Sequence, residues 1–341
     1  MRIALDAMGG DHAPHEIVRG AVEAANKLKD ITCVLLVGDE TAVNAELAKY
    51  PKVNMEKLKV VHAPEAIGMD EAPAQAVRKK KQCSISICME MVKNKEADAM
   101  VSAGNSGAVA ASAVLTLGRI PGVTRPAIAT ALPTRLPTRP TLLLDAGANT
   151  DCEAIWLAQF AVMGVAYSQA VLKRPVPVVG LLSIGSEDGK GNEMTKKAFH
   201  LMQKIDVSFH GNVEGSDLFM GEMDVVVCDG FVGNAVIKTA ESVAKAVGYW
   251  IKKEFFLDPV RMFGALLLKG ALQTLKSRMD PEIYGGAPLL GIPGTVLISH
   301  GSSTHRAIYH AIIAAAAAAT NNLTDTITKR IAAMEVMIAE P

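Results

Sequence analysis

The sequence predicts an α/β protein: a three-layer αβα sandwich around a mostly parallel sheet, with a helical hairpin protruding from it. Short β-branched or apolar runs alternate along the chain with helical patterns, and loops rich in Gly, Ser, Asn, Asp or His join them. Strands that alternate with helices pair in parallel through right-handed crossovers. We therefore expect the loops after the strands along one edge of the sheet, where open α/β sheets bind ligands.

Composition limits the class of protein. The 341 residues are 50% hydrophobic, which supplies a sizeable core. Lys plus Arg and Asp plus Glu both number 35, so net charge gives no evidence for a nucleic-acid partner. The amino terminus enters a strand-like run without a leader pattern, and no stretch reaches the roughly 18 apolar residues that span a bilayer. We expect a cytoplasmic protein that at most contacts a membrane surface. Its cysteines are expected as reduced thiols in the core: Cys33, Cys83, Cys88, Cys152 and Cys228.

Six units share the plan of strand, small-residue loop and helix. One helix is expected to begin at about Pro14. Another is expected to end at Met163, with Thr150 or Asp151 as its amino-terminal cap. Each helix amino terminus offers free backbone N–H groups to an anion, so several that converge predict a phosphate pocket. A simpler explanation is that glycine-containing loops occur in any fold of this type. The expected strands span residues 2–6, 97–102, 141–145, 176–184, 223–228 and 295–299.

The region after residue 240 breaks this plan. Two helical stretches flank LDP and predict a hairpin joined at Asp258 and Pro259. We expect an α/β domain of residues 1–240 and 281–341, and a hairpin of residues 241–280. Its lower apolar faces suit a core or dimer interface, whereas its tip could bind a membrane surface or an acidic protein. The tip combines apolar and basic residues: Trp250, Phe255, Phe256, Leu257 and Phe263 with Lys252, Lys253, Arg261 and Lys269.

The first loop, MGGDHAP, follows a strand that ends in a carboxylate. Asp6, Asp11 and His12 lie within seven residues, and Gly9 and Gly10 allow a ligand to approach the backbone. This combination predicts one wall of a site, with His12 as its most reactive side chain.

The loop GSEDGKGNE is one residue short of a P-loop, because Gly185 and Lys190 are too close in sequence. Gly191 stands where a P-loop has the Ser or Thr that binds magnesium, so this is not a nucleotidase motif. Lys190 can bind phosphate as a point charge, while Gly189 and Gly191 admit a ligand to the backbone. The alternative is a solvated turn, and the loop also carries Glu187 and Asn192.

Two further loops carry polar side chains. In SAGNSGA, Asn105 and Ser106 either cap a helix or bind an oxyanion. In HGSSTHR, His300 and Ser302 suggest a nucleophile and its base, but no G-x-S-x-G turn is present and Ser302 can cap its helix.

Acidic residues are expected at the same sheet edge. They could bind a divalent metal, orient His12 and Lys190, or accept backbone hydrogen bonds from loops. Because no known metal-ligand spacing occurs, we favour orientation and predict no metal site. These residues are Asp6, Asp11, Asp145, Glu187 and Asp229.

Six motifs in order give the chain a close resemblance, nearly full length, to the bacterial fatty acyl-acyl carrier protein:phosphate acyltransferases, the PlsX family. They are IALDAMGGDHAP, SAGNSGA, LLDAGAN, LLSIGSEDGKGNE, VVVCDGFVGN and GIPGTVLISHGSS. The resemblance implies a fold like the isopropylmalate and isocitrate dehydrogenases and phosphotransacetylases. It also implies acyl-phosphate formation from an acyl carrier protein thioester and inorganic phosphate. The product would feed the glycerol-3-phosphate acyltransferase of phospholipid synthesis, and such proteins are homodimers that can associate peripherally with a membrane.

The expected mechanism needs neither a cofactor nor an acyl-enzyme. Phosphate bound by Lys190 and Asn192 would be held for attack on the thioester carbonyl. Asn105, Asn234 or backbone N–H groups would stabilise the oxyanion, and His12 or His300 could take the proton from phosphate. The catalytic assignments are therefore Lys190, His12, Asn105 and Asn234. Expected binding residues are Asp6, Gly9, Gly10, Asp11, Ser106, Asp145, Asn149, Glu187, Gly189, Gly191, Asn192, Asp229, His300 and Ser302.

Three alternatives stay open. A phosphotransacetylase-like enzyme would prefer short acyl-CoA to long acyl-carrier substrates. A metal- and NAD-dependent decarboxylating dehydrogenase would form NADH, although the chain lacks a G-x-G-x-x-G fingerprint. A lipid or carrier-protein binder without activity would tolerate Lys190→Ala. The carrier could dock on the hairpin or on the basic run at residues 78–81, which is otherwise a solvated helix face.

Overall fold

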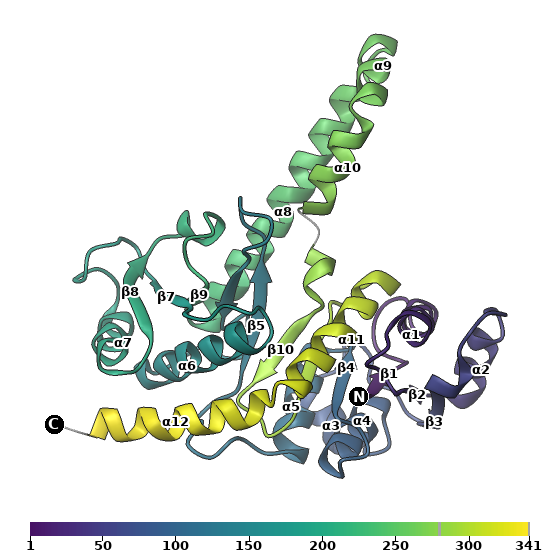
Figure 1. The fold of residues 1–341 in the computed structure, drawn as a ribbon, viewed down its shortest axis with the longest axis horizontal. Coiled ribbons are helices and arrows are strands. Elements are labelled where there is room, and N and C mark those ends of the chain that lie inside the picture. Colours follow the sequence, from purple (N-terminus) through teal and green to yellow (C-terminus); the bar gives the residue numbers. More distant parts are fainter. Residues whose placement is uncertain (279–280, 340–341) are drawn as a thin grey trace.

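A single eleven-stranded sheet forms the centre of the molecule (Figure 1). This computed structural model describes residues 1–278 and 281–339. Along the sheet the strand order is β3-β2-β1-β4-β11-β10-β5-β6-β9-β7-β8. The bounds are β1 Arg2–Asp6, β2 Cys33–Gly38, β3 Leu58–His62, β4 Ala99–Ser102, β5 Ala127–Leu132, β6 Thr141–Leu144, β7 Val178–Leu182, β8 Ser208–Val213, β9 Val225–Val227, β10 Ala287–Leu290 and β11 Val296–Ile298.

Two parallel groups of strands make up the sheet. The first group is β3, β2, β1, β4 and β11, and the second is β6, β9, β7 and β8. Three antiparallel pairings, β11 with β10, β10 with β5 and β5 with β6, join the two groups. Three reversals leave the groups running in opposite directions. Our expectation that all the loops after strands lie along one edge of the sheet was therefore wrong. No local pattern in the sequence indicates these reversals of strand direction.

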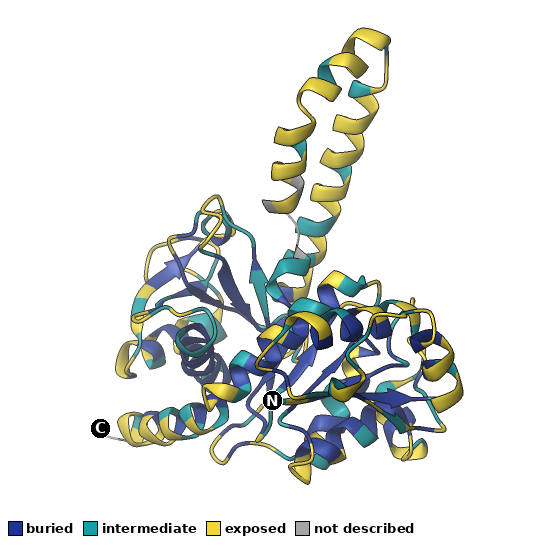
Figure 2. Ribbon diagram, turned by 45° about the vertical axis from the view of Figure 1, so that its right-hand side comes forward, coloured by how far each residue is buried: buried dark blue, intermediate teal, exposed yellow. Residues whose placement is uncertain are grey.

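Helices cover both faces of the sheet, as predicted for three layers (Figures 1 and 2). In β1, Ile3 and Leu5 pack against α1 and α11, while Ala4 faces the core beneath α4 and α5. This alternation follows from the two-residue period of a strand. The helices outside the hairpin are α1 His15–Lys27, α2 Glu40–Leu47, α3 Pro73–Lys79, α4 Ser84–Lys93, α5 Ser106–Thr116, α6 Ala154–Ala170, α7 Glu193–Lys204, α11 His305–Thr320 and α12 Leu323–Ala339, with short 3-10 turns at Met55–Lys57, Asp217–Phe219 and Pro281–Tyr284.

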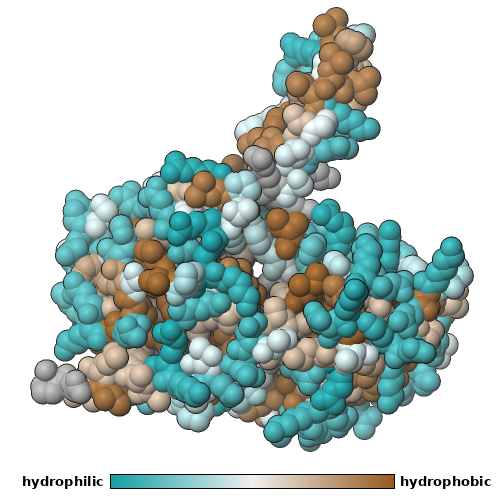
Figure 3. Space-filling model, viewed as in Figure 1, coloured by the Kyte–Doolittle hydropathy of each residue, from teal (hydrophilic) through white to brown (hydrophobic). Residues whose placement is uncertain are grey.

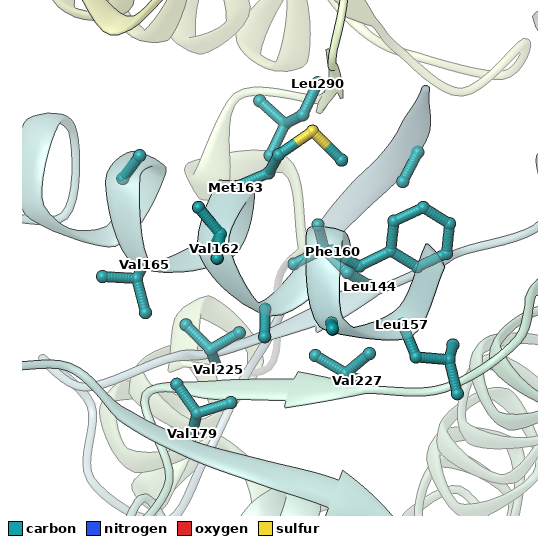
Figure 4. Close-up of a cluster of buried hydrophobic side chains, with 14 of the residues drawn as sticks. Leu144, Leu157, Phe160, Val162, Met163, Val165, Val179, Val225, Val227 and Leu290 are labelled. Carbon is teal, nitrogen blue, oxygen red and sulfur yellow. The ribbon is translucent and has the colours of Figure 1, made fainter. Parts of the chain in front are cut away.

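The second group packs on α6, which is buried around most of its circumference. Phe160 and Met163 of this helix belong with Val225 and Leu144 of the sheet to one cluster of buried side chains (Figure 4). The helix begins after Glu153, which makes no side-chain cap, so the expected cap at residue 150 or 151 was wrong. All five cysteines are free thiols. Cys83, Cys88 and Cys228 are buried as expected, whereas Cys33 and Cys152 are only half-buried.

The hairpin projects away from the sheet (Figure 1). It consists of α8 Gly230–Phe255, α9 Pro259–Leu267 and α10 Lys269–Arg278. Asp258 caps α9 and Pro259 opens it, as predicted for the turn. However, α8 starts directly at the loop after β9, so the expected boundary at residue 241 falls inside one continuous helix. In the described part of the chain, no helix combines the length and the apolar content needed to cross a bilayer.

Candidate active site

A cleft of about 600 Å³ opens between the two strand groups. Its floor comes from β5 and β10, including Ile128, Thr130 and Ala287. One wall comes from the loops after β1, β4 and β11, and the other from the loop after β6 and from α8. Loops from both strand groups therefore line the cleft, although the two groups place their loops at different edges of the sheet.

Three helix amino termini converge on this cleft. Ser106 of α5, Asn234 of α8 and Ala307 of α11 all line it. Asn105 and Asp229 cap the first two helices, whereas Thr304 provides no side-chain cap for α11. The helix dipoles favour an anion in the cleft, as do those first-turn N–H groups that are not bonded within the protein. In α8 the N–H groups of Gly230, Val232 and Gly233 are already bonded, so this helix contributes mainly through its dipole.

The loop after β11 brings polar side chains to the cleft. Ser302 N donates to His300 Nδ1 at 3.2 Å, and Ser302 Oγ lies 2.8 Å from the same nitrogen. Because the backbone N–H donates, the neutral ring carries its proton on Nε2 and can donate it to a ligand. The expected capping role of Ser302 was wrong, since Thr304 occupies the cap position of α11.

Ser299 also lines the cleft and was missed in the sequence. It is 3% exposed, and its Oγ has no hydrogen-bond partner among the described residues. A buried hydroxyl without a partner carries a cost in free energy, which a ligand oxygen in the cleft would offset. The sequence feature that could have identified Ser299 is its hydroxyl at the carboxyl end of a strand, directly before His300.

Asp6 and Asp145 are buried and hold loops rather than face the cleft. Asp6 Oδ2 accepts from Ser102 Oγ at 2.6 Å, and a Cβ added at Gly9 would lie 2.5 Å from that oxygen. Asp145 accepts from Ile128 N at 3.0 Å and from Asn149 N at 2.7 Å. Burial raises the pKa of both carboxyls, and these hydrogen bonds oppose the shift. For Asp6 and Asp145 the structure therefore shows the third of the roles considered, acceptance of hydrogen bonds that hold loops.

The predicted asparagines divide into two kinds. Asn105 donates both amide hydrogens to the carbonyls of Met69 and Glu71 and accepts from Ala108 N, so it shows the capping alternative. Asn149 bonds Pro126 O and Asp145, and Asn192 caps α7. Asn234 lines the cleft, and no side-chain hydrogen bond from it to another described residue is observed.

The remaining predicted residues are not all brought together. Asp11 lines the cleft, and its N–H bonds Gly301 O at 2.8 Å. Gly10 needs to be glycine there, since its φ is +100° and a Cβ would lie 2.8 Å from that same carbonyl oxygen. His12 is exposed and does not line the cleft. The loop after β7, with Glu187, Gly189, Lys190, Gly191 and Asn192, also lies outside the cleft lining, and its Lys190 is exposed.

Other lysine and glutamate side chains line the cleft without having been predicted. They are Lys238, Glu241, Lys245 and Glu282. In the ranges that the structure describes, no group of three His, Cys, Asp or Glu side chains is placed to hold a metal ion.

The fold resembles that of phosphotransacetylases. A phosphotransacetylase from Streptococcus pyogenes superposes with a TM-score of 0.60 at 19% identity, over 94% of both chains. The phosphotransacetylase EutD from Staphylococcus aureus gives 0.58 at 18% identity, also over 94% of both chains. A 4-hydroxythreonine-4-phosphate dehydrogenase from Klebsiella pneumoniae gives 0.53 at 14% identity, over 94% of this chain and 97% of that one. These likenesses establish the fold.

The sequence comparisons give the family. A family model described as "Fatty acid synthesis protein" matches residues 1–326. A phosphate acyltransferase from Desulforamulus reducens is 50% identical over 92% of both chains. Another from Thermoanaerobacter pseudethanolicus is 47% identical over 98% of both. The chain belongs to the phosphate acyltransferase family and is an acyltransferase of fatty acid and phospholipid synthesis, which confirms the resemblance seen in its motifs.

Proposed function

We propose that the chain reversibly transfers a long-chain fatty acyl group from acyl carrier protein to inorganic phosphate, giving acyl-phosphate for phospholipid synthesis. The observation that supports this most is the convergence of α5, α8 and α11 on one cleft with a partly apolar floor. The positive ends of helices favour phosphate, and an apolar surface beside them suits the acyl chain of a thioester.

The reaction requires positioning more than it requires a strong base. A phosphate oxygen attacks the thioester carbonyl, the C–S bond breaks and the thiolate leaves with the bonding pair, later taking up a proton. Thiols have a pKa of about 8.5, so this group leaves readily and the main barrier is charge on the carbonyl oxygen. The amide of Asn234 and N–H groups at the start of α5 are suited to stabilise that charge.

His300 is better suited to bind phosphate than to deprotonate it. With Nδ1 engaged by Ser302 N, the neutral ring offers an Nε2–H donor. The phosphate dianion is already a competent nucleophile near neutral pH. Ser299 and Ser303, both buried in the cleft wall, supply further hydroxyl groups.

Phosphate-dependent release of thiol from palmitoyl-acyl carrier protein, with hydroxylamine trapping of the product, tests this function. Release that requires phosphate and yields a trappable acyl group supports it. Release without phosphate would identify a thioesterase, and no release from a folded sample would refute the proposed activity.

The phosphotransacetylase-like fold favours one competing function, transfer from acyl-CoA. Palmitoyl-acyl carrier protein and acetyl-CoA would be compared at equal concentration. A clear preference for the CoA thioester would replace acyl carrier protein as the donor.

We also propose that the chain forms a homodimer through the lower part of the hairpin and contacts a membrane at α9, near the glycerol-3-phosphate acyltransferase that would use its product. Apolar side chains gather at the hairpin tip (Figure 3). Val260, Phe263 and Leu267 are 81%, 62% and 71% exposed. Light scattering would give the oligomeric state. Cosedimentation with phospholipid vesicles that Phe263→Asp does not weaken would refute the membrane contact.

A further inference from the structure

One wall of the cleft is a stripe of ionisable residues on a single helix. Asn234, Lys238, Glu241 and Lys245 are spaced by four, three and four residues, which places them on one face of α8. All four line the cleft. Helix α8 runs from the sheet outward along the hairpin (Figure 1), and the stripe lies within its first sixteen residues.

The charges on the two walls differ. Lys238 Nζ lies 3.4 Å from Glu241 Oε2, and Lys245 has no ion-pair partner in residues 1–278 and 281–339. The α8 wall therefore carries two cations and one carboxylate. The opposite wall carries carboxylates: Asp11, and Glu282, which accepts from Thr304 Oγ1 at 2.9 Å. An anionic group bound in the outer cleft is consequently favoured on the α8 side.

The length of the stripe matches a particular kind of substrate. Eleven residues separate Asn234 from Lys245, so the stripe extends roughly 16 Å along the helix. An acyl thioester on a phosphopantetheine arm has its reacting carbonyl at one end and an anionic phosphate ester at the other, separated by a chain of comparable length.

We infer that Lys238 and Lys245 bind the phosphate of this arm while its thioester lies at Asn234. The inference rests on the proposed function, since it takes an acyl thioester as the donor. Acyl carrier protein and CoA both carry the arm, so the shared ligand is the phosphopantetheine phosphate. Lys238 and Lys245 act here as specificity residues for the donor.

The test compares three palmitoyl thioesters in the wild type and in K238A/K245A. Palmitoyl-acyl carrier protein and palmitoyl-CoA contain the phosphate, whereas S-palmitoyl-pantetheine lacks it. We expect kcat/KM to fall about 10-fold for the first two, mainly through KM, because charge-assisted hydrogen bonds to phosphate are lost. With S-palmitoyl-pantetheine, kcat/KM is expected to stay unchanged. Lys197→Ala, an exposed lysine of α7 outside the cleft, is the matched control.

Each other pattern overturns the inference. Equal losses with all three thioesters would point to damage to the cleft, and no loss would remove the lysines from donor binding. A loss confined to the carrier protein would place them against the protein surface. If the wild type shows no phosphate-dependent turnover, the proposed function fails, and calorimetry still decides the inference. The wild type should bind phosphopantetheine more tightly than pantetheine, and K238A/K245A should remove that difference.

Discussion

Asp145 organises the loop between β6 and α6 through its two carboxylate oxygens. Oδ1 accepts from the N–H groups of Ile128, Gly147 and Ala148, and Oδ2 accepts from the N–H and the side-chain amide of Asn149. Gly147 lines the cleft, so these bonds connect a buried charge to the shape of the site.

Asp145→Asn is expected to reduce both stability and activity. The new amide would point a donor at other donors, which costs about 1–3 kcal/mol in the free energy of unfolding. Urea unfolding followed by circular dichroism measures the loss. Asp151→Asn, a change at an exposed position nearby, should leave stability unchanged. Equal stability of the two variants would contradict the organising role of Asp145.

Asn234 has the opposite character, because it lines the cleft without holding the fold together. Asn234→Ala should lower kcat roughly 100-fold if its amide stabilises the oxyanion, while the unfolding midpoint stays the same. Steady-state kinetics with palmitoyl-acyl carrier protein measures this. Asn105→Ala is the contrast, since removal of a helix cap costs about 1 kcal/mol of stability. A kcat for Asn234→Ala within the error of the wild type would exclude the catalytic role.

At the scale of elements, helix α1 is held on both sides by carboxylates. Glu46 Oε1 lies 2.7 Å from His15 Nδ1 and its Oε2 lies 2.6 Å from Lys49 Nζ, while Glu16 Oε2 lies 2.8 Å from His305 Nδ1. Burial acts to raise the pKa of Glu46 and of Glu16, but hydrogen bonds and ion pairs with these partners outweigh it and hold the pKa of each carboxyl below its usual range.

Acid should therefore loosen the attachment of α1, which starts directly after the MGGDHAP loop. A carboxyl with a lowered pKa in the folded state contributes stability above its unfolded pKa and loses it as pH falls through the folded one. We expect Glu46→Gln to be about 1 kcal/mol less stable than the wild type at pH 7. The difference should vanish once the pH has fallen below the lowered pKa of Glu46 in the folded protein. Urea midpoints across this range measure it, with the exposed Glu40→Gln as control. A difference that is independent of pH would contradict the ionic contribution.

Elements with a strong local pattern were predictable, and their pairing was not. The β-branched run at β9 and the Asp-Pro turn at residues 258 and 259 follow from propensity and capping. The antiparallel directions of β5 and β10 depend on contacts between segments far apart in the chain. Asp11, Ser106, Asn234, His300 and Ser302 were predicted because they follow strands. Lys238 and Lys245 were missed because a boundary was expected inside α8, although their helical spacing was visible.

At the scale of the whole molecule, the separation of the two strand groups bears on Lys190. The sequence predicts a catalytic lysine, yet the loop after β7 lies outside the cleft lining and two strands from β6 in the sheet.

The prediction made from the sequence is that Lys190→Ala remains folded and loses most of its turnover, because the loop after β7 binds phosphate. The cleft proposed above gives the opposite expectation, since Lys190 does not line it. The kinetics of thiol release and the KM for phosphate measure the effect, and Lys196→Ala on the adjacent helix provides the control. Unchanged turnover would mean that residues lining the cleft perform the reaction without Lys190.

The continuous helix α8 also sets the direction in which the hairpin tip faces relative to the cleft. Its 26 residues carry Asn234 near one end and lead into the apolar tip at the other. Each residue of an α-helix adds about 100° of rotation, so the number of residues between cleft and tip sets the direction in which each faces. Two extra residues between Lys245 and the tip would turn the tip by about 200° relative to the cleft, whereas seven would almost restore its direction. Length variation in this segment is therefore constrained by helical phase as well as by reach.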